Sequence, residues 1–254
     1  MKRILSLLLI FTMIFALASC SGKDDGETTA PPPVIEENSH SKEFRNSEGT
    51  VVFTVDVAVP QIAENCEEKV KNYINGLCLE IFEDACDFAE SNLENATDFM
   101  KSTGSTTPWS KKITFETTYL SPRYACFIVK DAFSYFGKND SPVWSTKCFD
   151  IKTGELCTLD DFSLYTDAPS DGYDFFLSNI LAPALETDFI HPEYITPEVL
   201  GRVDEITDYE DFYLTDNGMG FYFNKNKVHE FLNGMFKIEF TWEDLMSVYE
   251  LPAE

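Results

Sequence analysis

Basic side chains are scarce in this sequence. Its 254 residues include 19 Lys and Arg against 44 Asp and Glu, which gives a formal net charge of −25 at pH 7. A surface of this sign repels phosphate backbones, so no nucleic-acid partner is expected. The charge favours cationic partners or metal ions, although acidic surfaces commonly serve only to keep a protein soluble.

Histidine and the common catalytic motifs are also scarce. The three histidines are His40, His191 and His229, which we interpret as structural or solvent-facing side chains. The stretch that begins at His229 resembles the start of a zinc-protease helix, but Asn233 stands where the second histidine ligand is needed. No Gly-x-Ser-x-Gly nucleophile motif occurs. We therefore predict no catalytic residue, no metal site and no cofactor.

Neighbouring carboxylates are the one catalytic arrangement that the composition supplies, since two of them about 5–10 Å apart suffice for glycoside hydrolysis. The candidates are Asp160, Asp161, Glu210, Asp211, Glu243 and Asp244. In a chain with 44 acids such neighbours arise by chance, so nothing distinguishes one pair as catalytic. The acids from Asp160 to Asp174 could hold Ca²⁺, but no twelve-residue calcium loop is present and a solvated loop is favoured.

No Cys-x-x-Cys motif occurs, which argues against structural zinc and thioredoxin-like redox chemistry. Six cysteines follow Cys20 and could form up to three disulfides or remain buried thiols. If strands 123–136 and 143–151 pair about a turn at Gly137, Cys126 faces Cys148 directly. Facing Cβ atoms lie about 4.5–5.5 Å apart, so this register allows a disulfide but does not require it.

Only one long apolar run is present, and it lies at the N-terminus. Basic residues at positions 2 and 3 precede a mainly apolar run of fifteen residues, from Ile4 to Ala18, and Cys20 follows. The run is short for a membrane-spanning helix but fits a signal peptide. The small residues before Cys20 resemble a bacterial lipobox. We therefore expect residues 1–19 to be a lipoprotein signal peptide and Cys20 to be lipidated, which would hold the chain at the outer face of the bacterial cytoplasmic membrane.

Residues 20–49 contain few apolar side chains and a run of three prolines, which predicts a disordered tether. The folded region is expected at residues 50–254. One way to divide it is into two subdomains, 50–140 and 141–254. Alternating apolar residues predict a strand from Val51 that ends at Pro60. An apolar stripe with steps of three and four residues then predicts a long helix from Ile62 to Phe88. The stripe consists of Ile62, Cys66, Val70, Tyr73, Leu77, Ile81, Ala85 and Phe88.

Further strands are expected at 111–121, 123–136 and 143–159, the last being a hairpin that turns at 152–154. Helical segments are predicted at 173–189 and 197–206. A hairpin over 212–224 is predicted to turn through a three-residue loop closed by Gly218 with a positive φ, its aromatics filling a buried face. A strand at 235–240 and a final helix capped by Thr241 complete the pattern. The order predicts an α+β fold with a mainly antiparallel sheet, packed with a long N-terminal helix and shorter C-terminal helices.

Three segments in this order resemble the RsiV-like extracytoplasmic domain family. They are "VDVAVPQIAENCEEKVKNYIN", which includes Ile74-Asn75; "FDIKTGELCTLDDF"; and "FYLTDNGMGFYFN", which is followed by Asn233-Gly234 and "WEDL". The family includes the lysozyme-sensing domain of the RsiV anti-sigma factor and the non-catalytic N-terminal domain of the deacetylase PdaC. This chain departs from the family at residues 136–140, where a histidine-containing stretch is usual, and in its six additional cysteines. The resemblance implies an α+β domain outside the membrane, linked to cell-wall stress and without a catalytic centre.

The leading hypothesis is a lipid-anchored binding or sensing module for a cationic protein or a cell-wall ligand. Lysozyme-like proteins are the candidates that the resemblance implies. The alternatives are a wall-modifying hydrolase that uses paired carboxylates and a structural envelope lipoprotein. A sigma factor is not an expected partner, because only residues 1–3 precede the apolar run and a specific interface takes about 20–30 residues a side.

Overall fold

The computed structural model describes residues 30–135, 138–139, 142–188, 194–201, 211–224, 227 and 235–251. Its larger sheet has six strands in the order β1-β2-β3-β4-β5, with β6 also paired to β4. The strands are β1 Val34–Arg45, β2 Val51–Glu64, β3 Trp109–Leu120, β4 Tyr124–Tyr135, β5 Lys138–Asn139 and β6 Val143–Asp150. β2 and β3 run parallel, and the other neighbouring pairs are antiparallel.

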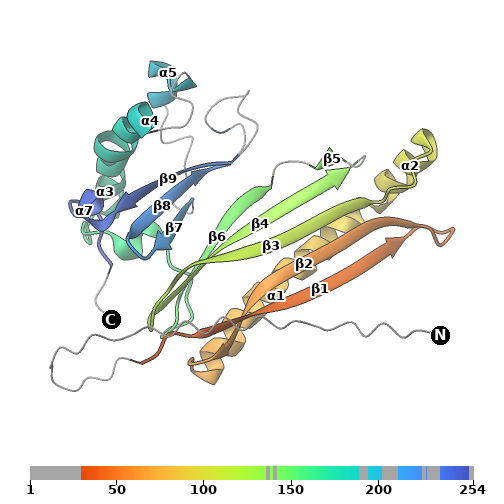
Figure 1. The fold of residues 1–254 in the computed structure, drawn as a ribbon, viewed down its shortest axis with the longest axis horizontal. Helices are drawn as coiled ribbons and strands as arrows, with labels where there is room; N and C mark the ends of the chain where they lie inside the picture. The colour runs from red at the N-terminus through yellow and green to blue at the C-terminus, as the bar shows by residue number, and fades with distance from the viewer. Residues whose placement is uncertain are drawn as a thin grey trace, which may run out of the picture.

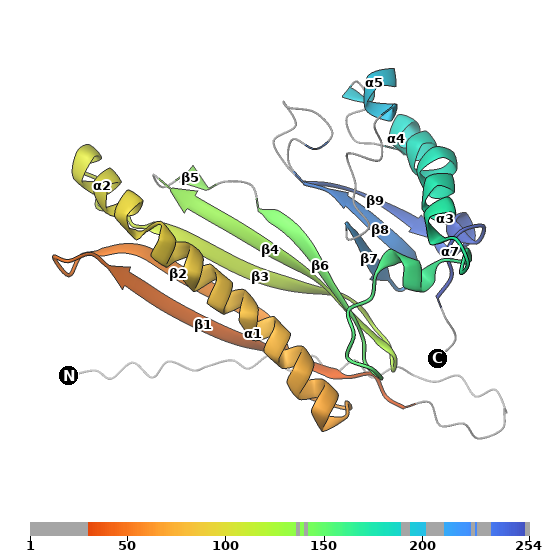
Figure 2. The same cartoon turned by 180° about the vertical axis from the view of Figure 1, so that it is seen from behind.

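Two helices connect the parallel strands. α1 spans Glu68–Ser91 and α2 spans Leu93–Thr103, and α1 lies across one face of the larger sheet (Figure 2). The alternating residues Phe53, Val55 and Val57 of β2 face this helix and are buried. They pack with Ile74 and Ala85 of α1. The alternate residues of the strand and one face of the helix therefore form a single hydrophobic core.

A smaller sheet with the order β7-β8-β9 forms the other end of the molecule (Figure 1). Its strands are β7 Phe212–Thr215, β8 Gly218–Phe223 and β9 Phe236–Thr241. A continuous helical segment covers one face of it; the parts are α3 Pro169–Phe176, the π-helical η2 Leu177–Leu181 and α4 Ala182–Asp188. The short elements are η1 Leu159–Phe162, α5 Pro197–Leu200 and α7 Trp242–Leu245.

β4 contributes to two hydrophobic cores, the one between α1 and the larger sheet and the one of the smaller sheet, because both of its faces are buried. Its residues from Tyr124 to Val129 all lie below 5% exposure. Alternate side chains enter the α1 core (Ala125, Phe127, Val129) and the core of the smaller sheet (Tyr124, Cys126, Ile128). The backbone N–H of Leu214 in β7 donates to Cys126 Sγ at 3.4 Å, so the smaller sheet packs directly on β4. The predicted α+β class is confirmed.

The expected tether is shorter than predicted, because Val34–Arg45 forms β1 and pairs with β2 along its length. Val34, Ile35 and Phe44 are the apolar residues of this strand, so it lacks the alternation that identifies strands in sequence. Polar side chains contact α1 instead: His40 stacks on Phe82 with ring centroids 4.9 Å apart, and Lys42 pairs with Glu90. The folded region therefore begins before residue 50.

The predicted first helix begins too early. β2 continues past Pro60, which is paired with Glu37 of β1, and ends at Glu64. α1 starts at Glu68, and its buried residues include Ile74 and Cys78, neither of which was in the predicted stripe. Tyr73, which was in that stripe, is 56% exposed. Only part of the predicted stripe therefore faces the core.

The β7–β8 hairpin is confirmed and its aromatic residues are buried, but its turn differs from the prediction. Asp216 and Asn217 form a two-residue loop, because Thr215 pairs with Gly218. Gly218 belongs to β8 and is not among the glycines with a positive φ. A side chain is excluded there for another reason: a Cβ atom would lie 1.9 Å from the backbone oxygen of Phe240 in β9.

β6 belongs to the larger sheet through its pairing with β4, so the expected division at 140 and 141 does not separate the sheets. The segments at 173–189 and 197–206 are helical as predicted where they are described, and Pro183 follows the π-helical turn. The predicted signal peptide and Cys20 lie outside the described residues. Within the described residues, no helix combines the length and apolarity needed to span a membrane.

Candidate functional site

Two of the acids proposed for hydrolysis, Asp161 and Asp244, cap the N-termini of helices. In η1, Asp161 Oδ2 accepts from the backbone N–H of Thr158 at 2.6 Å, and in α7, Asp244 Oδ2 accepts from that of Thr241 at 2.9 Å. Both are capping boxes of the Thr-x-x-Asp type. The hydrogen bonds from Thr241 lower the pKa of Asp244, which suits a carboxylate cap and not a general acid.

The other acidic candidates are dispersed. Asp160 and Glu243 are exposed, each next to a capping residue, whereas Asp211 lies just before β7. Glu210, His191 and His229 lie outside the described residues. Among the residues that are described, no three His, Cys, Asp or Glu side chains are grouped so as to hold a metal ion. The prediction of no metal site and no cofactor remains a prediction.

Three cysteines lie together beneath the smaller sheet. Cys126 and Cys148 are directly opposite on β4 and β6, which is the predicted register. Cys157 donates its backbone N–H to the carbonyl oxygen of Cys148 at 2.7 Å. All three are free thiols in this structure, so the disulfide stays a prediction. Burial, together with hydrogen bonds to the other two thiols, raises the pKa of Cys148 well above its usual value.

A run of exposed carboxylates follows α1 into α2. No Lys or Arg occurs between Asn72 and Met100, and every acid in this stretch is exposed. We call this set the acidic face; it consists of Glu80, Glu83, Asp84, Asp87, Glu90, Glu94 and Asp98. The spacing of three and four residues places these acids on the solvent side of the helices. In the described part of the chain, Glu90 alone among them has an ion-pair partner, Lys42 at 3.2 Å.

Composition predicted an acidic protein but did not locate this surface. The signal was available in the sequence, because the same helical spacing that separates the buried residues of α1 also separates the acids. The apolar stripe alone does not reveal it. The acidic face was therefore missed as a candidate site, although each of its residues could be assigned to a helix.

A groove with a volume of about 350 Å³ lies between α1 and strands β3, β4 and β6. We call it the α1 groove; its lining is Ile81, Asp84, Ala85, Phe88, Lys111, Ile113, Val129, Asp131, Ser145 and Lys147. Lys111 Nζ lies 2.6 Å from Asp131 Oδ2 and 4.5 Å from the centre of the Phe88 ring. The other carboxylate oxygen of Asp131 is buried without a hydrogen-bond partner, so it can accept from a ligand.

The α1 groove and the acidic face share Asp84. The groove has an apolar floor and charged groups at its rim, which is the composition of a surface that receives a side chain of another molecule. Cys78 precedes the groove residues on α1 and is buried; this burial raises its pKa to about 11, so it is not an activated nucleophile. The arrangement suits the binding of a ligand that carries both apolar and charged groups.

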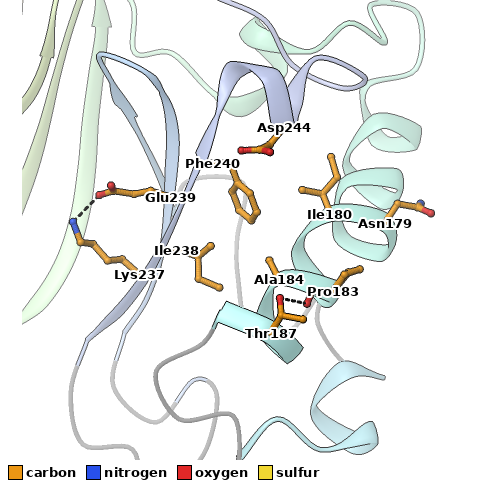
Figure 3. A pocket seen from close by; sticks show the side chains of 10 residues that line it. All are labelled: Asn179, Ile180, Pro183, Ala184, Thr187, Lys237, Ile238, Glu239, Phe240 and Asp244. Atoms are coloured by element: carbon orange, nitrogen blue, oxygen red, sulfur yellow. Dashed lines mark hydrogen bonds and ion pairs between the residues drawn. The ribbon is translucent and has the colours of Figure 1, made fainter.

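A second groove, of about 610 Å³, lies between β9 and the η2–α4 helix. Figure 3 shows Ile238 and Phe240 directed toward the helix and Lys237 and Glu239 directed away from it. Glu239 accepts hydrogen bonds from Lys237 Nζ at 2.6 Å and from the Tyr213 hydroxyl at 2.7 Å. These two bonds lower the pKa of Glu239. The carboxylates of this groove are therefore stabilised as anions.

No protein-family model and no curated protein sequence matches the chain. Solved structures share its fold. A DUF3298 family member from Bacteroides fragilis is 12% identical with a TM-score of 0.58, over 88% of this chain and 96% of that one. A DUF3298 family protein from Pseudomonas aeruginosa is 9% identical with a TM-score of 0.51, over 87% of this chain and 96% of that one. At these identities the likeness concerns the fold alone.

Proposed function

We propose that this protein is a lipid-anchored, extracytoplasmic binding module for a cationic protein, with the acidic face as its docking surface. The observation that carries the proposal is the exposure of every carboxylate between Asn72 and Met100, with no basic side chain in that stretch. A one-sign surface raises the local concentration of an oppositely charged partner and accelerates its association.

The α1 groove supports the same assignment because it adjoins the acidic face. Electrostatic attraction alone gives weak and unspecific binding, whereas a desolvated side chain in a pocket supplies affinity. An apolar side chain of the ligand would pack on Ile81 and Phe88. A basic group next to it would reach the unpartnered oxygen of Asp131 or the carboxylate of Asp84.

The location rests on the lipobox-like sequence before Cys20. Residues 20–33 precede β1 and would connect the lipid to the folded region. A flexible chain of this length has a root-mean-square reach of about 20 Å. We propose further that the domain is an RsiV-like one, for which lysozyme is the natural cationic probe. The DUF3298 fold supports the extracytoplasmic type of domain without identifying the ligand.

A hydrolase is less well supported, because Asp161 and Asp244 serve as helix caps and the pKa of Asp244 is lowered. A general acid in a glycosidase needs a raised pKa. The structural-lipoprotein hypothesis makes no use of the acidic face, and the binding experiment decides between it and our proposal.

The test uses the mature chain from residue 20 with Cys20→Ser, titrated with lysozyme by isothermal calorimetry. One variant neutralises the acidic face with Glu80→Gln, Glu83→Gln, Asp87→Asn and Glu94→Gln. We expect its affinity to fall by about tenfold or more, because about 1.4 kcal/mol of lost attraction corresponds to that factor. Wild-type binding should weaken with salt, since the Debye length falls from about 10 Å at 0.1 M to about 3 Å at 1 M.

A matched control removes the same charge from exposed sites elsewhere, with Glu64→Gln, Glu155→Gln, Glu186→Gln and Glu198→Gln. It should retain wild-type affinity. Equal weakening in both variants would mean that net charge and not the acidic face attracts the ligand. If the wild-type chain binds no basic envelope protein at low salt, the structural-lipoprotein hypothesis is preferred.

A further inference from the structure

β9 is an edge strand of the smaller sheet, and its pairing with β8 fixes the direction of its backbone groups. The backbone N–H of Trp242 donates to the Asn217 oxygen at 2.9 Å. Because the backbone of an antiparallel strand alternates in direction, Ile238 also directs its N–H and C=O to β8. Lys237 and Glu239 therefore direct their backbone groups away from the sheet. Within the described ranges, no strand lies beyond β9.

The opposite edge of this sheet is covered, so among the residues that the structure describes β9 is the edge that is open to another chain. β7 lies against the larger sheet, where the Leu214 N–H reaches Cys126 Sγ. An open edge of unpaired backbone groups binds a further strand unless charged residues or a covering element prevent it. On β9 the charged residues are Lys237 and Glu239, with side chains 52% and 49% exposed.

The sequence of β9 is complementary to itself when it is reversed. Residues 236–240 are Phe-Lys-Ile-Glu-Phe, which matches its own reverse except that Lys and Glu exchange places. A two-fold axis through Ile238 would place Lys237 opposite Glu239 of a second copy and Phe236 opposite Phe240. Opposite charges and aromatic pairs directly across an antiparallel ladder stabilise the pairing.

We propose that β9 pairs antiparallel with β9 of a second copy about a two-fold axis at Ile238, giving a homodimer with a continuous sheet. The backbone directions agree with this register. Lys237 and Glu239 of the second copy would form hydrogen-bonded pairs through their outward N–H and C=O groups, and the two Ile238 residues would form the non-hydrogen-bonded pair between them. Such an interface is isologous, so it closes at two copies.

The groove beside β9 supplies space for the added strand. It is lined on the helix side by Ile180, Pro183, Ala184 and Thr187 and on the sheet side by residues 237–240 (Figure 3). Apolar side chains of the second β9 can therefore be buried against Ile180 and Ala184. A parallel pairing in register would instead place Lys beside Lys and Glu beside Glu, which is unfavourable.

Charge reversal tests this register directly in the mature chain with Cys20→Ser. Lys237→Glu alone places Glu opposite Glu, and Glu239→Lys alone places Lys opposite Lys. By sedimentation velocity, each single variant should dimerise at least about tenfold more weakly than the wild type. The double variant Lys237→Glu/Glu239→Lys should dimerise as the wild type does, because opposite charges face each other again.

Mixing the two single variants separates the loss of the ion pair within one β9 from the loss of contacts between two copies. Each loses the ion pair within its own β9, and mixing cannot restore that contact. It does restore opposite charges across the interface, so a heterodimer should form where each variant alone is monomeric. A wild-type chain that stays monomeric at high concentration would overturn the proposal, as would single variants that both dimerise as strongly as the wild type. Lysozyme binding is measured separately and its result does not bear on β9.

Discussion

The side-chain amide of Asn224 takes the place of a neighbouring strand for Trp144. Its Oδ1 accepts from the Trp144 backbone N–H at 2.8 Å, and its Nδ2 donates to the Trp144 carbonyl at 3.0 Å. Trp144 lies on β6, which pairs with β4 on one side only, and Asn224 directly follows β8. One side chain thus satisfies both outward backbone groups of β6 at this point and connects the smaller sheet to the larger one.

Asn224→Ala should therefore lower the free energy of unfolding by about 2–3 kcal/mol, since a partly buried donor and acceptor would both lose their partner. Urea denaturation followed by circular dichroism measures the change. Asn179→Ala is the matched control, because the Asn179 amide contacts only Phe175 of its own helix and is exposed. The control should change stability by less than about 0.5 kcal/mol. Equal effects in the two variants would contradict the role assigned to Asn224.

Asn75 makes the corresponding contact between α1 and β2. Its Oδ1 accepts from the Ile62 N–H at 2.8 Å and its Nδ2 donates to the Ile62 carbonyl at 3.0 Å. β3 pairs with β2 only as far as Val57, so Ile62 has no strand on that side. This contact gives a physical reason for an asparagine at this position of α1.

Asn75→Asp should destabilise the fold more at pH 7 than Asn75→Ala. The introduced carboxylate would face the Ile62 carbonyl and could not donate to it, whereas a protonated carboxyl could. Its folded pKa is therefore raised, and the deficit relative to wild type should shrink as the pH falls through that pKa. Thermal denaturation at a series of pH values checks this. A deficit that does not change with pH would show that Asn75 does not donate to Ile62.

The sequence predicted those elements whose periodicity is complete. β2, β3, β4 and the β7–β8 hairpin alternate or are apolar throughout, and each was expected close to its observed position. β1 was missed because its pairing is made by the backbone and its contacts with α1 are polar, as with Lys42 and Glu90. Pro60 misled the prediction since strand β2 continues beyond it.

The candidate site was predictable only in part. Thr-x-x-Asp patterns identify Thr158 and Thr241 as capping residues, and the same patterns assign the Asp161 and Asp244 carboxylates to the caps of η1 and α7. The α1 groove was not predictable, because it joins α1 to three strands that are distant in sequence. Such a site depends on tertiary packing and has no local signal.

Asp244 offers a pH-dependent test of the α7 cap. Hydrogen bonds from Thr241 lower the folded pKa of Asp244 below the usual aspartate value of 3.8. A lowered folded pKa means that the stabilisation is complete above the unfolded pKa and is lost as the pH falls through the folded pKa. Asp244→Asn should therefore be less stable than wild type at pH 7, and the two should converge as the pH is lowered past 3.8. Glu243→Gln, at the exposed neighbouring position, should show no such convergence.

The lipid anchor is tested by one substitution at the N-terminus. If Cys20 is acylated, Cys20→Ser in the full chain should abolish labelling by a radioactive or clickable fatty acid and partitioning into the detergent phase. Cys66→Ser is the control and should leave both unchanged, because Cys66 lies after β2 in the folded region. Persistent labelling of the Cys20→Ser variant would contradict the lipobox interpretation.

The cysteines beneath the smaller sheet provide the last prediction. Three thiols can form only one disulfide among themselves, and the antiparallel register favours Cys126–Cys148 because they face each other directly. In oxidised protein we expect non-reducing peptide mapping to find this bond and a free Cys157. Closing a loop of about 20 residues should stabilise the fold by about 3 kcal/mol. In reduced protein at pH 8, iodoacetamide should modify the partly exposed Cys157 before Cys148, whose raised pKa leaves little thiolate. A Cys148–Cys157 bond would contradict the predicted pairing, and faster modification of Cys148 would contradict its burial.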